Sequence, residues 1–66
     1  MDAVNIYSKM VSYLKFLGFR DAVVNNYQLD DENRNVTIFF AYNNANCCGG
    51  NYVEDELTAS YATVFS

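Results

Sequence analysis

The segment from Val36 to Tyr42 restricts the possible folds of this chain more than any other. Its residues alternate as in a β-strand, and one side of that strand would carry only apolar residues, namely Val36, Ile38, Phe40 and Tyr42. The opposite side carries Phe39 between Thr37 and Ala41. Such a strand has apolar surface on both of its faces. We therefore expect each face to be covered, either by another part of the chain or by another molecule.

The chain from Asp2 to Leu17 predicts an amphipathic helix. Its apolar residues recur at steps of three and four residues: Ala3, Ile6, Tyr7, Met10, Tyr13, Leu14 and Leu17. Asp2 is a suitable N-cap, because its carboxylate can accept hydrogen bonds from the first free backbone N–H groups. Gly18 can adopt the left-handed conformation that ends many helices, and Phe19 can then pack back onto the last turn. We therefore expect the helix to stop at Gly18.

A hairpin is expected to follow the helix. The residues from Ala22 to Leu29 alternate loosely, with Val23, Asn25, Tyr27 and Leu29 on one face and Val24, Asn26 and Gln28 on the other. The polar cluster from Asp30 to Arg34 predicts the turn that joins this strand to the strand at Val36 to Tyr42.

The C-terminal part of the chain supports two interpretations. Asn and Gly dominate residues 43–51, which predicts a loop. After it, Val53, Leu57 and Tyr61 recur at a helical spacing, whereas the Thr, Tyr, Val and Phe residues between positions 58 and 65 favour a strand. We expect an α+β fold in a single domain of residues 1–66, with an N-terminal helix packed on one face of a three-stranded antiparallel meander. The alternative is an α-β-β-α arrangement in which the C-terminal segment is helical.

Phe39 is the centre of the interface that the sequence predicts. One helix cannot cover both faces of a sheet, so Phe39 would lie on the uncovered face. We expect Val24, Val64 and Tyr52 to surround it there. Either these neighbours simply shield the ring, or the cluster forms an interface with a partner protein or a second copy of the chain. We expect the interface.

Six of the eight acidic residues stand in two clusters, one of Asp30, Asp31 and Glu32 and one of Glu54, Asp55 and Glu56. Only four basic residues oppose them, so the net charge is −4 and the pI is about 4.2. This charge disfavours direct binding to the phosphates of a nucleic acid. The clusters instead predict an acidic surface that steers a basic protein, such as a nucleic-acid-handling one, into contact.

The residues needed for most catalytic and metal sites are missing. The chain has no His, and therefore lacks the commonest general base and metal ligand. Cys47 and Cys48 are adjacent, so they cannot join distant segments by a disulfide and supply only half of a zinc site. We expect no enzyme activity, no cofactor, no metal and no small-molecule substrate. A redox or metal role for the two cysteines is the least favoured alternative.

These exclusions favour a small non-catalytic acidic interaction module, which would act as an inhibitor or regulator by blocking a surface of a larger partner. Small acidic chains without cofactors are typical of phage accessory proteins, which is an argument from class alone. The alternative is a structural subunit that forms a homodimer. Neither a signal-peptide pattern nor a membrane span stands out, so we expect a cytoplasmic location, in the host cytoplasm if the chain is phage-encoded.

Overall fold

The computed structural model describes residues 3–44 and 51–66. Its elements follow one another as α1 (Ala3–Phe16), β1 (Val23–Asp30), β2 (Asn35–Asn43), β3 (Tyr52–Ser60) and α2 (Tyr61–Phe65). The three strands form one antiparallel sheet in the order β1-β2-β3. The α+β fold expected from the sequence is therefore confirmed.

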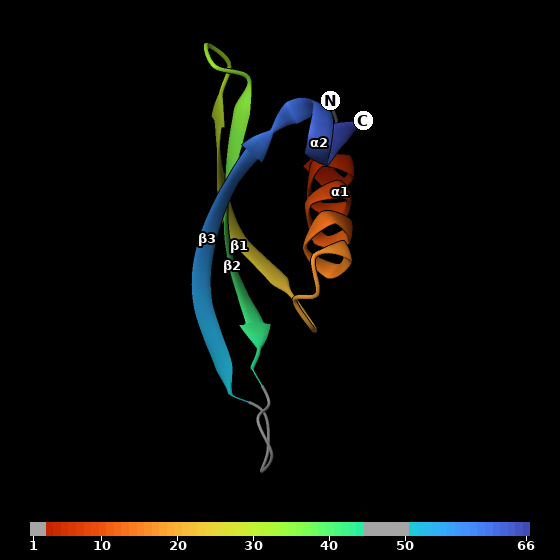
Figure 1. The fold of residues 1–66 in the computed structure, drawn as a ribbon, viewed down its shortest axis with the longest axis vertical. Helices are drawn as coiled ribbons and strands as arrows, with labels where there is room; N and C mark the ends of the chain where they lie inside the picture. The colour runs from red at the N-terminus through yellow and green to blue at the C-terminus, as the bar shows by residue number, and fades with distance from the viewer. Residues whose placement is uncertain (1–2, 45–50) are drawn as a thin grey trace.

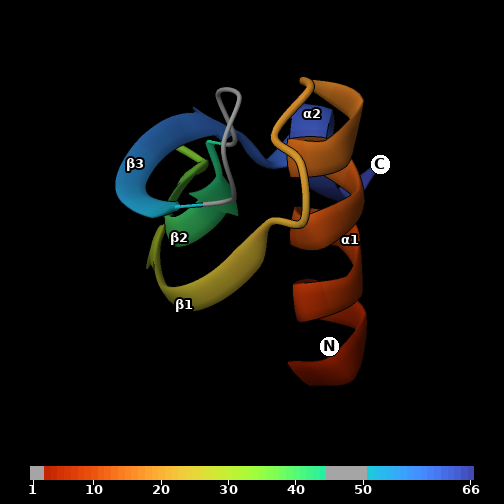
Figure 2. The same ribbon diagram turned by 90° about the horizontal axis from the view of Figure 1, so that it is seen from below.

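The elements form two layers (Figure 1). Both helices lie on the same side of the sheet, and α2 packs against α1. Figure 2 shows a strongly twisted sheet with α1 running along one side of it. Within the described ranges, the other face of the sheet has no helix over it.

The core lies between α1 and the central strand β2. The residues buried between these two elements are Ile6, Met10 and Leu14 of α1 and Val36, Ile38 and Phe40 of β2. Steps of four residues on a helix and of two on a strand place each set on a single face. The predicted helix and central strand are thus confirmed, with bounds that differ by one residue. Asp2, the expected N-cap, lies outside the described residues.

Gly18 ends α1, as the sequence predicts. It has a φ of +101°, and its N–H donates to the carbonyl of Lys15 (3.0 Å). The N–H of Phe19 donates to the carbonyl of Leu14 (3.0 Å), which completes a Schellman motif. The Phe19 ring then packs edge-on against Phe40, with 4.9 Å between the ring centroids. The helix stop therefore also anchors the following chain to the core.

The turn between β1 and β2 is the polar cluster that the sequence predicts. Asp30 accepts hydrogen bonds from the backbone N–H (3.2 Å) and the side-chain amide (2.9 Å) of Asn33. Arg34 closes the turn with a φ of +57°, in the left-handed region. The hairpin is confirmed, and both of its strands reach one residue further into the turn than expected.

The C-terminal segment is a strand in its first part and a helix in its last part, so each of the two interpretations is correct for one part of it. Tyr52–Ser60 form a strand as expected, but the expected continuation of that strand is wrong, because Tyr61–Phe65 form a helix. Ser60 is its N-cap, and the Ser60 Oγ accepts a hydrogen bond from the N–H of Thr63 (3.2 Å). The helix carries Val64 into the core, where it is buried. This burial and the cap outweigh the strand propensity of the local sequence.

Tyr61 ties α2 to the turn between β1 and β2. Its backbone N–H donates to the carbonyl of Arg34 (2.9 Å), and its hydroxyl donates to the Asp31 carboxylate (2.8 Å). The Arg34 guanidinium lies 5.7 Å from the centroid of the Tyr61 ring. Desolvation, followed by the hydrogen bond to Asp31, raises the pKa of Tyr61 to about 12. The fold therefore stabilises the neutral hydroxyl.

Candidate interaction surface

The face of the sheet that points away from the helices carries Phe39, and we call it the outer face. Residues that pair across neighbouring strands share a face. One row of the outer face consists of Asn26, Phe39 and Glu56, and the next consists of Val23, Ala41 and Glu54. Phe39 is half-buried between an amide on one side and a carboxylate on the other.

The expectation that Val24 lies beside Phe39 is wrong. A β-bulge interrupts β1 between Val24 and Asn26, so that Asn25 has no partner on β2. The extra residue shifts the alternation by one, and Val24 instead pairs with Phe40 and packs against the core. The outer face therefore presents an asparagine to the Phe39 ring where the sequence predicted a valine.

Val64 and Tyr52 are also separated from Phe39. Val64 is only 5% exposed and lies on the helix side of the sheet, because it belongs to α2 and not to a strand. Tyr52 does lie on the outer face and is 57% exposed, but it pairs with Asn43 at the far end of β3, whereas Phe39 pairs with Glu56. The structure therefore does not bring the four predicted apolar residues together.

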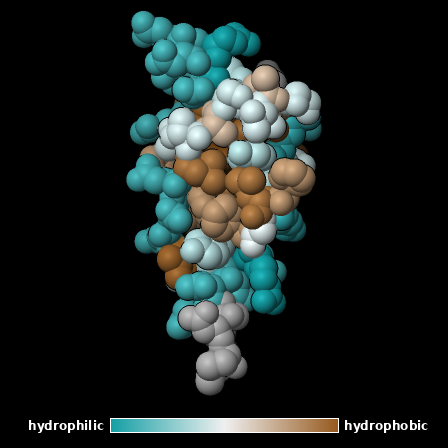
Figure 3. Space-filling model, viewed as in Figure 1, coloured by the Kyte–Doolittle hydropathy of each residue, from teal (hydrophilic) through white to brown (hydrophobic). Residues whose placement is uncertain are grey.

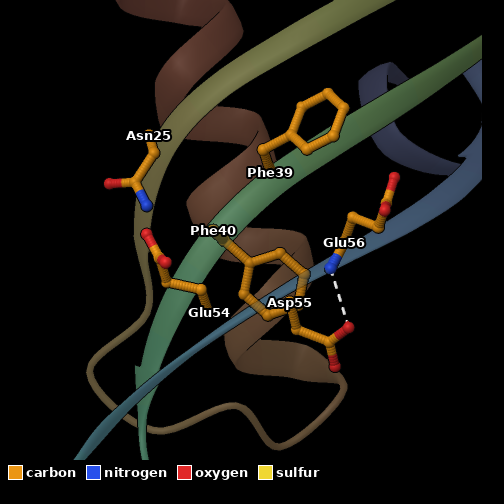
Figure 4. A pocket seen from close by; sticks show the side chains of 6 residues that line it. All are labelled: Asn25, Phe39, Phe40, Glu54, Asp55 and Glu56. Carbon is orange, nitrogen blue, oxygen red and sulfur yellow. Dashed lines mark hydrogen bonds between the residues drawn. The ribbon is translucent and has the colours of Figure 1, made fainter.

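A shallow hollow beside Phe39 takes the place of the expected apolar cluster (Figure 4). Its volume is about 390 Å³, and it is lined by Asn25, Phe39, Phe40, Glu54, Asp55 and Glu56. In Figure 4 the Asn25 amide and the Glu54 carboxylate point toward each other from β1 and β3. An aromatic ring next to carboxylate oxygens suits a positively charged side chain.

Asn25 and Asn26 are residues of this surface that the sequence analysis missed. Both lie at the bulge, and Asn25 lines the hollow. Two consecutive Asn residues inside a predicted strand are unusual, since Asn is disfavoured on a regular strand and tolerated at irregular positions. That pair of residues was the signal that could have indicated the bulge.

Charge is divided between the two layers of the molecule. The three strands contain no Lys or Arg and carry the carboxylates of Asp30, Glu54, Asp55 and Glu56. In contrast, α1 carries Lys9 and Lys15 and no acidic residue. A basic partner is therefore attracted to the sheet and repelled by α1.

The first acidic cluster largely serves the fold itself. Asp30 holds the turn through Asn33, and these hydrogen bonds lower the pKa of the Asp30 carboxyl below its usual value. Asp31 accepts the hydrogen bond from Tyr61. Two of the three carboxylates in the cluster, which also contains Glu32, therefore stabilise the turn and its contact with α2.

The second acidic cluster is arranged differently. Glu54, Asp55 and Glu56 are consecutive in β3, so Glu54 and Glu56 lie on the outer face and Asp55 on the helix side. The Asp55 carboxylate accepts a hydrogen bond from the backbone N–H of Glu56 (2.8 Å; Figure 4). All three residues are exposed. Glu54 and Glu56 therefore form the acidic part of the outer face next to Phe39.

Apolar surface also gathers in the opening between the sheet and the helices, on the side of the molecule seen in Figure 3. This area continues the core outward and lies between the layers. The sheet side of the same view is hydrophilic. The apolar area between the layers is therefore distinct from the outer face, where a single aromatic ring lies among polar and acidic side chains.

The described residues hold no group of three or more His, Cys, Asp or Glu side chains that could bind a metal ion. No helix in the described ranges has the length and apolar character needed to cross a membrane. Cys47 and Cys48 lie outside these ranges. The candidate surface itself consists of Phe39 with neighbouring acidic and amide side chains.

Comparison with known proteins adds no assignment. No protein-family model matches the chain, and no curated protein or solved structure matches it.

Proposed function

We propose that this chain is a small non-catalytic protein-interaction module that binds a basic surface of a larger protein and thereby acts as an inhibitor or regulator. The contact surface is the outer face, with Phe39 at its centre and Glu54 and Glu56 as its charged rim. The observation that carries the proposal is the half-buried Phe39 ring on a sheet face that no helix of the described chain covers (Figure 2).

The outer face has the composition of a contact surface. Protein interfaces commonly place an aromatic residue near the centre and polar residues around it, and the aromatic residue contributes most of the binding energy. Here Phe39 is flanked by Asn26 and Glu56 on the neighbouring strands. The carboxylates of the rim would attract a basic partner from a distance and orient it. An acidic partner or a phosphate backbone would be repelled.

The same charges oppose the homodimer that the sequence left as an alternative. If two copies met through their outer faces with β3 lying over β3, Glu54 and Glu56 of one copy would lie close to the same residues of the other. Like charges brought together at an interface cost several kcal/mol. This arrangement of two copies is therefore disfavoured, and we propose a different protein as the partner.

The proposal can be tested by affinity capture with the tagged full chain and three variants. Phe39→Thr removes the aromatic centre, and Glu54→Gln with Glu56→Gln removes the rim charges. The matched control combines Asp21→Asn with Glu32→Gln, which removes the same two charges elsewhere. Asn is tolerated at position 21, where φ is +54°.

We expect the wild-type chain and the control to retain a basic protein that the other two variants lose. Equal capture by all four chains would contradict the proposal, because the outer face would then have no role. Equal loss from both double variants would contradict it as well, because binding would then depend on net charge alone. Sedimentation at several concentrations identifies a homodimer, which we expect to be absent.

A further inference from the structure

The hydrogen-bonding directions along β3 follow from two bonds at its ends. The N–H of Asn44 donates to the carbonyl of Asn51 (2.8 Å), and the N–H of Tyr61 donates to the carbonyl of Arg34 (2.9 Å). Both pairs continue the register between β2 and β3. In an antiparallel ladder the bonded pairs alternate with unbonded ones. The odd-numbered residues of β3 therefore point their N–H and C=O groups at β2, and the even-numbered residues point theirs at the free edge.

The free edge of β3 is regular along its whole length. The register between β2 and β3 runs over Tyr52–Ser60 without a bulge. The backbone groups of Glu54, Glu56 and Thr58 therefore face outward in one line. The Glu56 N–H is held by the Asp55 carboxylate (2.8 Å), whereas those of Glu54 and Thr58 have no acceptor among the described residues. An edge of this kind offers backbone donors and acceptors for a further strand.

β1, the other edge strand, is less suitable. The bulge at Asn25 leaves a regular ladder only from Asn26 to Asp30. The Tyr27 N–H on that edge is already held by the Asn26 Oδ1 (2.8 Å). In addition, the Tyr27 ring packs edge-on against Tyr7 of α1, with 5.5 Å between ring centroids. Strand addition is therefore favoured at β3.

The side chains of β3 decide which strand can be added. A second copy that paired with β3 over its full length would place the two Glu56 residues directly opposite each other, with Glu54 and Asp55 of both copies close by. Like charges directly opposite on paired strands are destabilising, and charged residues commonly protect edge strands from pairing with themselves. A strand with Lys or Arg at the corresponding positions has the complementary charge.

We propose that the free edge of β3 accepts an extended segment of the partner as a fourth antiparallel strand, and that Lys or Arg alternates with uncharged residues in this segment. The residues opposite Glu54 and Glu56 bond to β3 through their backbone and point their side chains along the outer face. The single residue between them points to the helix side. This inference rests on the proposed function and specifies how the partner is held and what chemistry it carries.

The test uses the full chain and three synthetic peptides of about nine residues, the length of β3, in which Lys alternates with Val. The first peptide is unmodified. The second is N-methylated at the lysines, whose N–H groups would face β3. The third is N-methylated at the valines, whose N–H groups would face solvent. We expect the first and third to bind alike and the second about tenfold or more weakly, since the second loses several backbone hydrogen bonds to β3.

Hydrogen exchange of individual amides gives a second readout. On binding the unmodified peptide, the N–H groups of Glu54 and Thr58 should gain protection, because they would donate to the added strand. The N–H groups of Asp55 and Leu57 already point at β2, so their protection should change little. The Glu54→Gln, Glu56→Gln variant should bind the peptide more weakly than the Asp21→Asn, Glu32→Gln control.

Equal binding of the three peptides would overturn strand addition, as would the absence of binding or an even change of protection along β3. Protection of Thr58 in the free chain that grows with protein concentration would indicate pairing of two copies and overturn it too. The capture experiment is judged separately, because a partner can depend on Phe39 and the rim carboxylates without adding a strand. Failure of the inference is therefore distinguishable from failure of the proposed function.

Discussion

Phe39 and Phe40 are neighbours in the chain and differ in what covers them. Phe40 is 1% exposed, pairs with Val24 and packs against Phe19. Phe39 is half-buried on the outer face, between Asn26 and Glu56 on the neighbouring strands. The two side chains are identical and one backbone step apart, so the difference arises because both helices lie on one side of the sheet.

This comparison separates the part of the molecule that holds the fold from the part that is free to bind. The covered side contains all the fully buried side chains of the described core. The outer face carries Glu54 and Glu56, whose side chains are exposed to water. Substitutions on the covered side should mainly change stability, and substitutions on the outer face should mainly change binding.

The largest expected effect comes from Phe40→Ala. Removing a fully buried aromatic ring loses its burial and leaves a cavity, which destabilises a protein by about 3–5 kcal/mol. Urea unfolding followed by circular dichroism measures this loss, and in a chain this small we expect much of the population to be unfolded without denaturant. A loss below about 1 kcal/mol would contradict the assignment of Phe40 to the core.

Ser60→Ala should have the next largest effect, because it removes the N-cap of the helix that closes the covered side. Loss of such a cap costs about 1 kcal/mol. Urea unfolding of this variant is compared with that of Ser8→Ala, an exposed position of α1 without a cap role. Equal stability of the two variants would show that α2 does not depend on its cap.

Phe39→Thr should destabilise the fold by only about 0.5–1 kcal/mol, because a half-buried ring on an open sheet face contributes little beyond its cross-strand contacts. The same urea titration used for Phe40→Ala checks this value. Equal destabilisation by both substitutions would contradict the different roles of the two phenylalanines, since Phe39 would then be a core residue.

The smallest effect is the pH dependence expected from Tyr61. Its pKa is raised from 10.0 to about 12 in the fold, so the stability that it contributes is fully present below pH 10 and is lost as the pH rises toward 12. In Tyr61→Phe this contribution is absent. We expect the difference in unfolding midpoint between the two chains to shrink between pH 10 and 12. A constant difference over that range would contradict the hydrogen bond to Asp31.

Local patterns in the sequence predicted much of the fold. The four-residue spacing of Ile6, Met10 and Leu14 indicated the helix, Gly18 indicated its end, and the cluster around Asp30 indicated the turn. Each of these signals depends on residues within one or two turns of each other. Such contacts form in nearly any fold that the chain could adopt.

The candidate site could be predicted only in part. Phe39 and the second acidic cluster were identified from alternation and charge. Phe39 lies on β2, and the second acidic cluster lies on the neighbouring strand β3. The neighbours of Phe39 could not be identified, because the bulge at Asn25 reversed the face of Val24 and the helix after Ser60 removed Val64 from the sheet. A one-residue change of register moves every following side chain to the opposite face. Small local irregularities therefore change the whole composition of a sheet surface.

The sequence by itself determined the order of the N-terminal helix and the three strands, the excess of acid, and the presence of an apolar residue on both faces of β2. These properties follow from composition and from short-range periodicity. Only the tertiary structure decided which face stays open, that Asp30 and Asp31 are engaged by the hairpin and α2, and that the carboxylates of Glu54 and Glu56 line the hollow beside Phe39. Those outcomes depend on contacts between residues far apart in the chain, and such contacts form only when the layers pack together.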